Sequence, residues 1–216
     1  MGERSPGEKR EENAISVIQE ALSKAKHPFI VFTGDIHSLV ILHMVRRIAG
    51  NSIPVLHIDT TLHFQEIYLY IEKMRRFWGF QLIKERNKDV LGYTAIEKKR
   101  GRCCRMLKTE PLRKAIEKYT IDFLFTGMAR DGNGSQKGPI LISSTKGCLC
   151  LNPVAYLTRN DVWNYIKEHS LPYCSLYDRG YEDIDCMPCT EPPEDVSEMK
   201  QGEQEIHESL KALGYM

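Results

Sequence analysis

The sequence contains no apolar run near the length of a membrane span and no large excess of charge of either sign. A spanning helix needs about 20 consecutive apolar residues, and no stretch of the chain approaches this. With a net charge of +1, the chain lacks the broad positive field that is typical of proteins that bind nucleic-acid backbones. Residues 1–13 are charged and polar without an apolar core, unlike a signal peptide. We therefore expect a cytoplasmic protein with no membrane anchor and no nucleic-acid partner.

The composition is otherwise ordinary for a globular domain. Of the 216 residues, 42% are apolar and 27% are charged, which suits a chain that buries one sizeable core. The sequence also contains seven cysteines. In a reducing cytoplasm, cysteines serve as metal ligands or reactive thiols more often than as disulfides.

Short apolar runs alternate with segments in which apolar residues recur at helical spacing. The runs predict buried strands, and the segments between them predict helices. Strands are expected at residues 29–32, 55–58, 80–83, 121–125 and 148–151, and helices at 12–26, 39–48, 64–77, 109–119 and 159–169. Such alternation is typical of a parallel sheet with helices on both faces. We therefore predict an α/β fold with a doubly wound, mainly parallel five-stranded sheet.

Three regions are expected along the chain. Residues 1–12 are rich in Gly, Pro and charge and are expected to form a mobile N-terminal tail. Residues 13–190 are expected to form a nucleotide-binding domain that ends in a cysteine-bearing appendage. Residues 191–216 are acidic and polar, then weakly helical, and are assigned to a C-terminal tail or helix.

Polar residues follow three of the predicted strands at the point where each strand ends. They are Thr33, Gly34, Asp35, His37 and Ser38 after the first strand, Asp59 and Thr60 after the second, and Gly127, Arg130 and Asp131 after the fourth. Ligands of such sheets bind at the carboxyl ends of the strands, where the strand order reverses. A strand, a glycine-containing loop and a helix can direct amide groups at an anion. The alternative is an ordinary turn with Ser38 as the helix N-cap.

Two cysteine pairs lie far apart in the sequence. Cys103 and Cys104 are adjacent, and Cys186 and Cys189 form a Cys-x-x-Cys pair. Four thiolates on two loops could bind an iron–sulfur cluster or a zinc ion. The alternative is that the two pairs lie apart in the folded chain.

The three remaining cysteines have weaker signals. Cys148 and Cys150 alternate along a strand, so both are expected on one sheet face as buried structural residues. Cys174 lies in a predicted loop that would border the site, where it is either a packed thiol or a nucleophile.

Six stretches in order resemble the sulfonucleotide reductases, the phosphoadenylyl-sulfate and adenylyl-sulfate (PAPS/APS) reductase family of the adenine-nucleotide alpha-hydrolase-like (PP-loop) superfamily. Residues 33–38 correspond to its Ser-Gly-Gly-x-Asp-Ser loop, and residues 57–68 to its Asp-Thr-Gly-x-x-Phe-x-Glu-Thr-Tyr segment. Residues 103–112 resemble Cys-Cys-x-x-Arg-Lys-x-x-Pro-Leu, and residues 126–131 resemble Thr-Gly-x-Arg-Arg-Asp. Residues 152–181 match the closing region, and residues 185–190 match Gly-Cys-x-Pro-Cys-Thr.

The resemblance implies a cofactor, a substrate and an electron donor. In the cluster-bearing branch of the family, the cysteines equivalent to Cys103, Cys104, Cys186 and Cys189 bind a [4Fe-4S] cluster. Lys108 would lie between this cluster and the substrate phosphates. The residues implied to contact an adenine nucleotide are Thr33, Gly34, His37, Ser38, Asp59, Lys108, Gly127 and Arg130. The implied partners are a thiol or redox protein as electron donor and a second copy of the chain in a homodimer.

The chain departs from the family pattern at several positions. The family's reducing thiol lies near its C-terminus in Glu-Cys-Gly-Leu-His, whereas no cysteine follows Cys189 here. The family's reaction needs an activated thiolate, which Cys174, a small thiol or a partner protein would have to supply. In the first loop Asp35 stands in place of a glycine and His37 in place of the aspartate. Two family arginines are replaced, by Leu107 and Ala129.

Three hypotheses remain. The first is a [4Fe-4S] sulfonucleotide reductase-like enzyme, with Lys108 and Cys174 as candidate catalytic residues. The second is an ATP-dependent adenylating enzyme for sulfur transfer, which the altered first loop disfavours because ATP needs a phosphate cradle. The third is a non-catalytic iron–sulfur binding protein.

Overall fold

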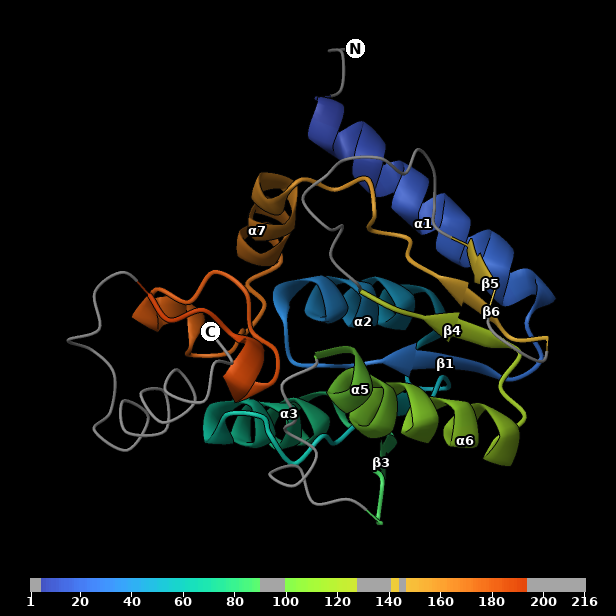
Figure 1. Ribbon diagram of the computed structural model, residues 1–216. Helices are drawn as coiled ribbons and strands as arrows, with labels where there is room; N and C mark the ends of the chain where they lie inside the picture. Colours follow the sequence, from blue (N-terminus) through green and yellow to red (C-terminus); the bar gives the residue numbers. More distant parts are fainter. Residues whose placement is uncertain (1–4, 90–99, 128–140, 144–146, 194–216) are drawn as a thin grey trace.

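The computed structural model of the protein describes residues 5–89, 100–127, 141–143 and 147–193 (Figure 1). Its strands are β1 (Pro28–Val31), β2 (Val55–Ile58), β3 (Leu82–Glu85), β4 (Phe123–Phe125), β5 (Leu141–Ser143) and β6 (Leu149–Leu151). Its helices are α1 (Pro6–Lys24), α2 (Ile36–Ala49), α3 (Gln65–Trp78), α5 (Arg100–Cys104), α6 (Glu110–Lys118) and α7 (Arg159–Glu168). A π-helical turn, η1 (Arg105–Thr109), joins α5 to α6, and 3-10 turns are η2 (Tyr177–Arg179) and η3 (Met187–Cys189).

The strands form one sheet in the order β3-β2-β1-β4-β6-β5. The five predicted strands are present, and every pairing among them is parallel. The sequence prediction missed β5, which pairs antiparallel with β6 at the edge. The segments that predicted β4 and β6 are longer than the strands themselves, whereas the apolar run at residues 140–142 has three residues, below the roughly four to eight that indicate a buried strand.

Helices cover both faces of the sheet. The larger core packs buried side chains of α1, α2, α3 and α7 against one face, with Ile30 and Val55 from the strands. The smaller core packs Ala115 and Ile116 of α6 against the other face, which presents Phe29 and Leu124. The chain runs from β1 outward to β2 and β3, then returns to β4 on the other side of β1. The strand order therefore reverses between β1 and β4, the point where such folds bind ligands.

The predicted mobile tail of residues 1–12 is wrong from Ser5 onward, because α1 begins at Pro6. Ser5 Oγ accepts a hydrogen bond from Glu8 N (3.3 Å), and Glu8 Oε2 accepts one from Ser5 N (2.6 Å). This reciprocal pair is a capping box. Arg10 on the same helix donates to both carboxylate oxygens of Asp161 on α7, at 2.9 Å each. Charged residues typical of a tail therefore attach α1 to the domain.

His43 lies on α2 in a half-buried cluster of polar aromatic side chains. Its Nδ1 is 2.9 Å from the Tyr165 hydroxyl, and its ring lies 5.1 Å from that of His169. Burial, together with the charges of His169 and Arg47, lowers the pKa of His43 to about 4. The folded protein therefore favours the neutral imidazole.

This cluster predicts a loss of stability in mild acid. Below about pH 6.5 the unfolded chain protonates His43, whereas the folded protein resists protonation until about pH 4. Wild type should therefore lose up to about 3 kcal/mol of unfolding free energy from this residue between pH 6.5 and 4. His43→Phe keeps a ring in place and should flatten this part of the profile in urea denaturation.

The control is His27→Gln, at an exposed position, which should leave the slope unchanged. Equal slopes for wild type and His43→Phe would show that His43 titrates alike in the folded and unfolded chains.

Candidate functional site

The loop after β1 is folded on itself at the start of α2. The N-cap is Asp35 and not Ser38, as one reading of the sequence had it, because Asp35 Oδ1 accepts from Ser38 N at 2.8 Å. Ser38 Oγ accepts from the main-chain N of Thr33 at 3.3 Å. Ile36 N, the first amide of α2, donates to the Tyr177 hydroxyl at 3.1 Å. Two amide donors that a phosphate could use at this helix start are therefore bonded within the chain.

Gly127 brings the end of β4 against this loop. A side-chain carbon at Gly127 would lie 2.6 Å from Ser38 N and 2.8 Å from the carbonyl carbon of His37. Carbon atoms are not tolerated at those distances, so only glycine permits the approach. The structure thus brings the polar ends of the first and fourth predicted strands together. Arg130 lies outside the described residues.

Asp59 closes the loop after β2. Its Oδ1 accepts from Thr61 N at 2.8 Å and from the Tyr68 hydroxyl at 2.7 Å. Burial works to raise the pKa of Asp59, but these two hydrogen bonds outweigh it and lower the pKa. The carboxylate is therefore ionised at neutral pH and holds the turn that leads to Thr60.

The second cysteine pair is attached to this β2 loop by main-chain contacts. Met187 N donates to Leu62 O at 2.7 Å, and His63 and Cys186 form an isolated antiparallel bridge. The Thr60 hydroxyl lies 3.1 Å from Cys186 Sγ. The position of Cys186 is therefore set by the loop that ends β2.

The first cysteine pair reaches the same place from α5. A small buried cluster contains Leu62, Leu107 and Cys186, with Cys103 and Cys189 packed against it. Burial raises the pKa of Cys103, and the charges of Cys104 and Cys189 raise it further. Such coupling needs short separations. Cys103 of the first pair and both cysteines of the second pair therefore lie in one cluster.

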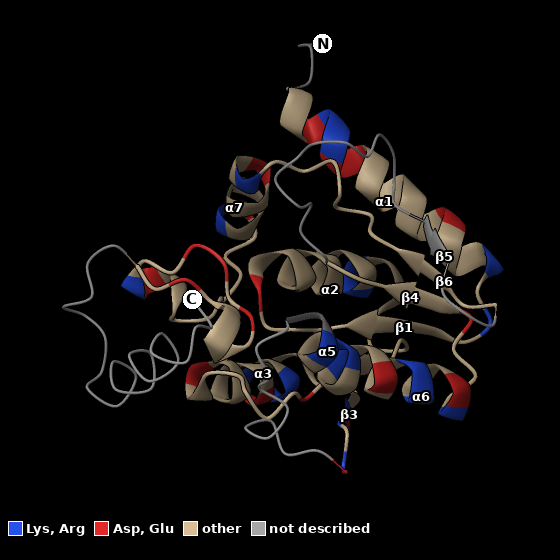
Figure 2. Cartoon of the chain, viewed as in Figure 1, with Lys and Arg blue, Asp and Glu red and all other residues tan. Residues whose placement is uncertain are grey.

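Lys108 lies beside these thiols and is paired with Asp185. Its Nζ donates to Asp185 Oδ1 at 2.6 Å and to Oδ2 at 2.5 Å. Burial works to lower the pKa of Lys108, but the charges of Cys186 and Asp185 outweigh it and raise the pKa. Figure 2 shows basic residues on α5 and acidic residues in the segment that leads to η3. The pair joins η1, which follows α5, to this acidic segment.

The four thiols fit a soft metal centre. All seven cysteines are free thiols, and burial raises the pKa of Cys186 to about 12. Buried thiols resist ionisation without a cation, whereas a bound metal deprotonates them. Four cysteines suit an iron–sulfur cluster or zinc. Cys103, Cys104, Cys186 and Cys189 are the residues that would hold it.

His63 is a residue at this centre that the sequence prediction missed. Ligand atoms of His63, Asp185 and Cys186 lie within 4.8 Å of one another. Burial lowers the pKa of His63 to about 4, and its Nδ1 has no hydrogen-bond partner among the described residues. No spacing in the sequence indicates this proximity, because it depends on how the β2 loop pairs with the second cysteine pair.

The other cysteines lie inside the hydrophobic cores. Cys148 and Cys150 are buried together on the α6 side of the sheet, in the smaller core, as their alternation predicts. Cys174 is 1% exposed in the larger core, and burial raises its pKa to about 11. A protonated, enclosed thiol is a poor nucleophile, which weighs against the catalytic role considered for Cys174.

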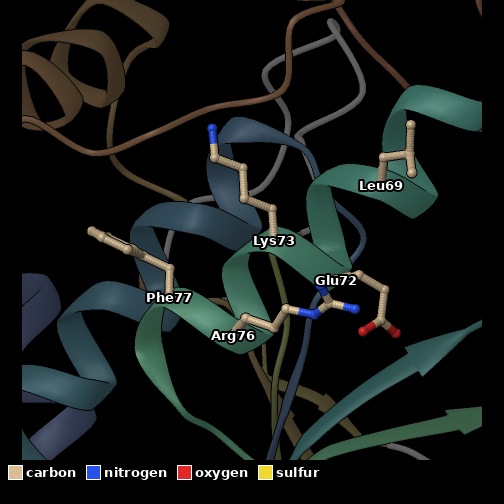
Figure 3. A pocket seen from close by; sticks show the side chains of 5 residues that line it. All are labelled: Leu69, Glu72, Lys73, Arg76 and Phe77. Atoms are coloured by element: carbon tan, nitrogen blue, oxygen red, sulfur yellow. The ribbon is translucent and has the colours of Figure 1, made fainter.

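A shallow pocket on α3 lies apart from this chemistry. Its lining consists of Leu69, Glu72, Lys73, Arg76 and Phe77, all from one helix (Figure 3). None of these residues belongs to the loops after β1, β2 and β4 or to the cysteine pairs. We therefore assign it no part in the site.

These features define an α/β protein with a candidate ligand site and thiol centre at the carboxyl edge of a doubly wound sheet. A profile of the phosphoadenosine phosphosulfate reductase domain matches residues 27–192. The chain belongs to this reductase family, as its motifs predict.

Two similar curated proteins are both named adenosine 5′-phosphosulfate reductase. Adenosine 5′-phosphosulfate reductase of Bacillus cereus (strain B4264) is 31% identical over 206 residues, covering 88% of this chain and 84% of the relative. The Geobacillus thermodenitrificans (strain NG80-2) reductase is 29% identical over 181 residues, covering 77% and 74%.

Solved structures agree on the fold. Phosphoadenylyl-sulfate (PAPS) reductase from Candida auris superimposes with a TM-score of 0.72 at 21% identity, covering 88% of this chain and 99% of that one. Candida glabrata FMN adenylyltransferase with ATP gives 0.69 at 15% identity, covering 96% and 74%. At these identities the likeness shows the fold alone. No helix among the described residues is long and apolar enough to cross a membrane.

Gly127→Ala should separate the ends of β1 and β4. The added carbon collides with backbone atoms of His37 and Ser38, so we expect a loss of about 1–3 kcal/mol in unfolding free energy, measured by urea denaturation. Gly50→Ala is the control, because it is strained by a φ of +62° but has no atom within 4 Å. A smaller loss for Gly127→Ala than for Gly50→Ala would contradict the close approach.

Proposed function

We propose that the chain is an oxidoreductase of the sulfonucleotide reductase type, which binds APS or PAPS and holds a [4Fe-4S] cluster. The cluster ligands would be Cys103, Cys104, Cys186 and Cys189. The observation that supports this is the meeting of the two cysteine pairs beside the β2 loop. The Bacillus and Geobacillus relatives bear the name of APS reductase, which agrees with that substrate.

The nucleotide would lie along the carboxyl edge of the sheet. Its binding site would begin at the loop after β1, with Thr33, Gly34, His37 and Ser38. It would continue to Asp59 after β2 and to Gly127 after β4, the two strands that flank β1. Lys108 would face the sulfate end, because its ammonium lies at the thiol centre. Arg130 remains a predicted contact from the sequence motif.

Reduction of APS to sulfite and AMP takes two electrons, which two thiols supply as they become a disulfide. One thiolate attacks the sulfate sulfur, and AMP leaves with the bridging oxygen. A second thiol then attacks the thiol sulfur of this S-sulfo adduct, which forms the disulfide and releases sulfite. When bound, the cluster would supply electrostatic and redox chemistry at the face where Lys108 lies. Burial of Cys174 favours an external thiol or redox protein as donor.

The adenylating alternative has one observation in its favour, the fold shared with FMN adenylyltransferase. The start of α2 argues against it. Asp35 and Tyr177 already accept from the amides of Ser38 and Ile36, and Asp35 adds negative charge where a triphosphate would bind.

Metal analysis of anaerobically purified protein tests the centre. We expect about four iron atoms and four sulfides per chain, as for a [4Fe-4S] cluster on four cysteines, lost in Cys103→Ser and in Cys186→Ser. Cys148→Ser is the matched control, because its thiol lies in the core on the α6 side. Zinc in place of iron, or equal iron in all variants, would remove the cluster from the proposal.

Nucleotide binding tests the substrate class. A ligand of the folded state stabilises it by about 2.7 kcal/mol at 100 times its Kd, so APS or PAPS should raise the melting temperature by several degrees. ATP should raise it less, because the amides at the α2 start are bonded within the chain. No shift with either sulfonucleotide at millimolar concentration would count against a reductase, and a metal centre without turnover would leave the non-catalytic hypothesis.

A further inference from the structure

Asp185 is placed where an anionic ligand group would be expected. Lys108 Nζ bonds both of its carboxylate oxygens, at 2.6 and 2.5 Å. The Lys108 side chain is 35% exposed and that of Asp185 is 50% exposed. The pair therefore lies at the rim of the thiol centre, where solvent and a ligand can reach it.

The Asp185 backbone is held by the cysteine turn itself. Asp185 N donates to Thr190 Oγ1 at 3.0 Å, and that hydroxyl donates to Cys186 O at 3.1 Å. Cys189 N donates to the same Cys186 carbonyl at 2.8 Å. Asp185 is thus a fixed part of the turn, and its carboxylate cannot move far from Lys108 without rotating its side chain into solvent.

Asp35 is a second carboxylate at a position where the anion of a ligand could bind, the start of α2. Asp35 caps α2, and its Oδ1 accepts from Ser38 N at 2.8 Å. Asp35 therefore fills an anion position at a helix start as Asp185 fills one at an ammonium. The family motifs quoted above have glycine at both positions. Two carboxylates of the chain thus stand at the two ends of the proposed nucleotide site.

We propose that Asp185 is a specificity-determining residue that occupies the anion position of Lys108 and weakens the binding of an oxyanion there. This inference rests on the proposed function, because it concerns the sulfate end of the nucleotide. An incoming sulfate must displace the carboxylate from the ammonium or lie against its charge. Two like charges about 6 Å apart repel enough to change affinity about tenfold at an effective dielectric constant of about 40, between the values for a protein surface and for water.

The test compares two nucleotides that differ only in the sulfate group. Full-length Asp185→Asn, purified anaerobically, should bind adenylyl sulfate about tenfold more tightly than wild type in calorimetry. Its affinity for AMP should change less than twofold, because AMP has no sulfate to meet Asp185. Asp183→Asn is the matched control: Asp183 lies in the same segment, exposed and paired with Arg159, and both affinities should stay as in wild type.

A double variant shows whether the gain acts through Lys108. Lys108→Gln combined with Asp185→Asn should lose the gain for adenylyl sulfate, because no ammonium is left for the sulfate. Iron, sulfide and zinc content must match wild type in each variant, and Asp185→Ser replaces Asp185→Asn if the asparagine variant loses metal. The inference is overturned if adenylyl sulfate binds wild type and variant equally, if AMP gains as much, or if the gain survives without Lys108.

Failure of the proposed function would have a different signature. If neither nucleotide binds wild type or Asp185→Asn, the reductase proposal fails, and inorganic sulfate then tests the inference alone. Sulfate should raise the melting temperature of Asp185→Asn more than that of wild type or Asp183→Asn. Equal shifts would overturn the role of Asp185 as well.

Discussion

The candidate site depends on a short stretch of main-chain pairing between two distant segments. Met187 N donates to Leu62 O, and Cys186 bridges His63. Without this contact, Cys186 would not lie beside Thr60 or near the thiols of α5. The pairing involves only two residues of each segment, yet it fixes which sulfur atoms share one buried cluster. The fold supplies the edge of a sheet, and this contact makes it a thiol centre.

Burial at this centre destabilises thiolates and thereby favours a metal that binds them. Thiols removed from water have raised pKa values, as Cys103 and Cys186 do, so thiolates are unstable there without a cation. Lys108 offers one positive charge, but Asp185 already shares it. A metal with several thiolate bonds is the larger compensation. The geometry therefore favours a protein whose local folding depends on what its cysteines bind.

The sequence predicted the sheet and most helices because those elements have clear periodicity. The parallel strands and the buried Cys148 and Cys150 follow from apolar runs and alternation. The start of α1 was missed because its charged residues match a tail in composition, while Arg10 finds Asp161 only in the folded chain. The N-cap was assigned to Ser38 in one interpretation because serine suits that position, whereas Asp35, three residues earlier, occupies it. His63 and the Lys108–Asp185 pair arise from contacts across the chain, which local pattern does not encode.

The π-helical turn η1 begins directly after the first cysteine pair and contains Lys108. A π-turn holds one more residue than an α-helical turn in the same length of helix, and such turns are frequent at functional sites. The extra residue of this turn therefore affects where Lys108 lies relative to the thiols of Cys103 and Cys104. A one-codon deletion within this turn would remove the extra residue and change the position of Lys108 relative to Cys103 and Cys104. The number of residues in this turn therefore sets where the Lys108 ammonium lies. Insertions or deletions here that keep the reading frame would move the ammonium relative to the thiols even when they leave Lys108 in the sequence.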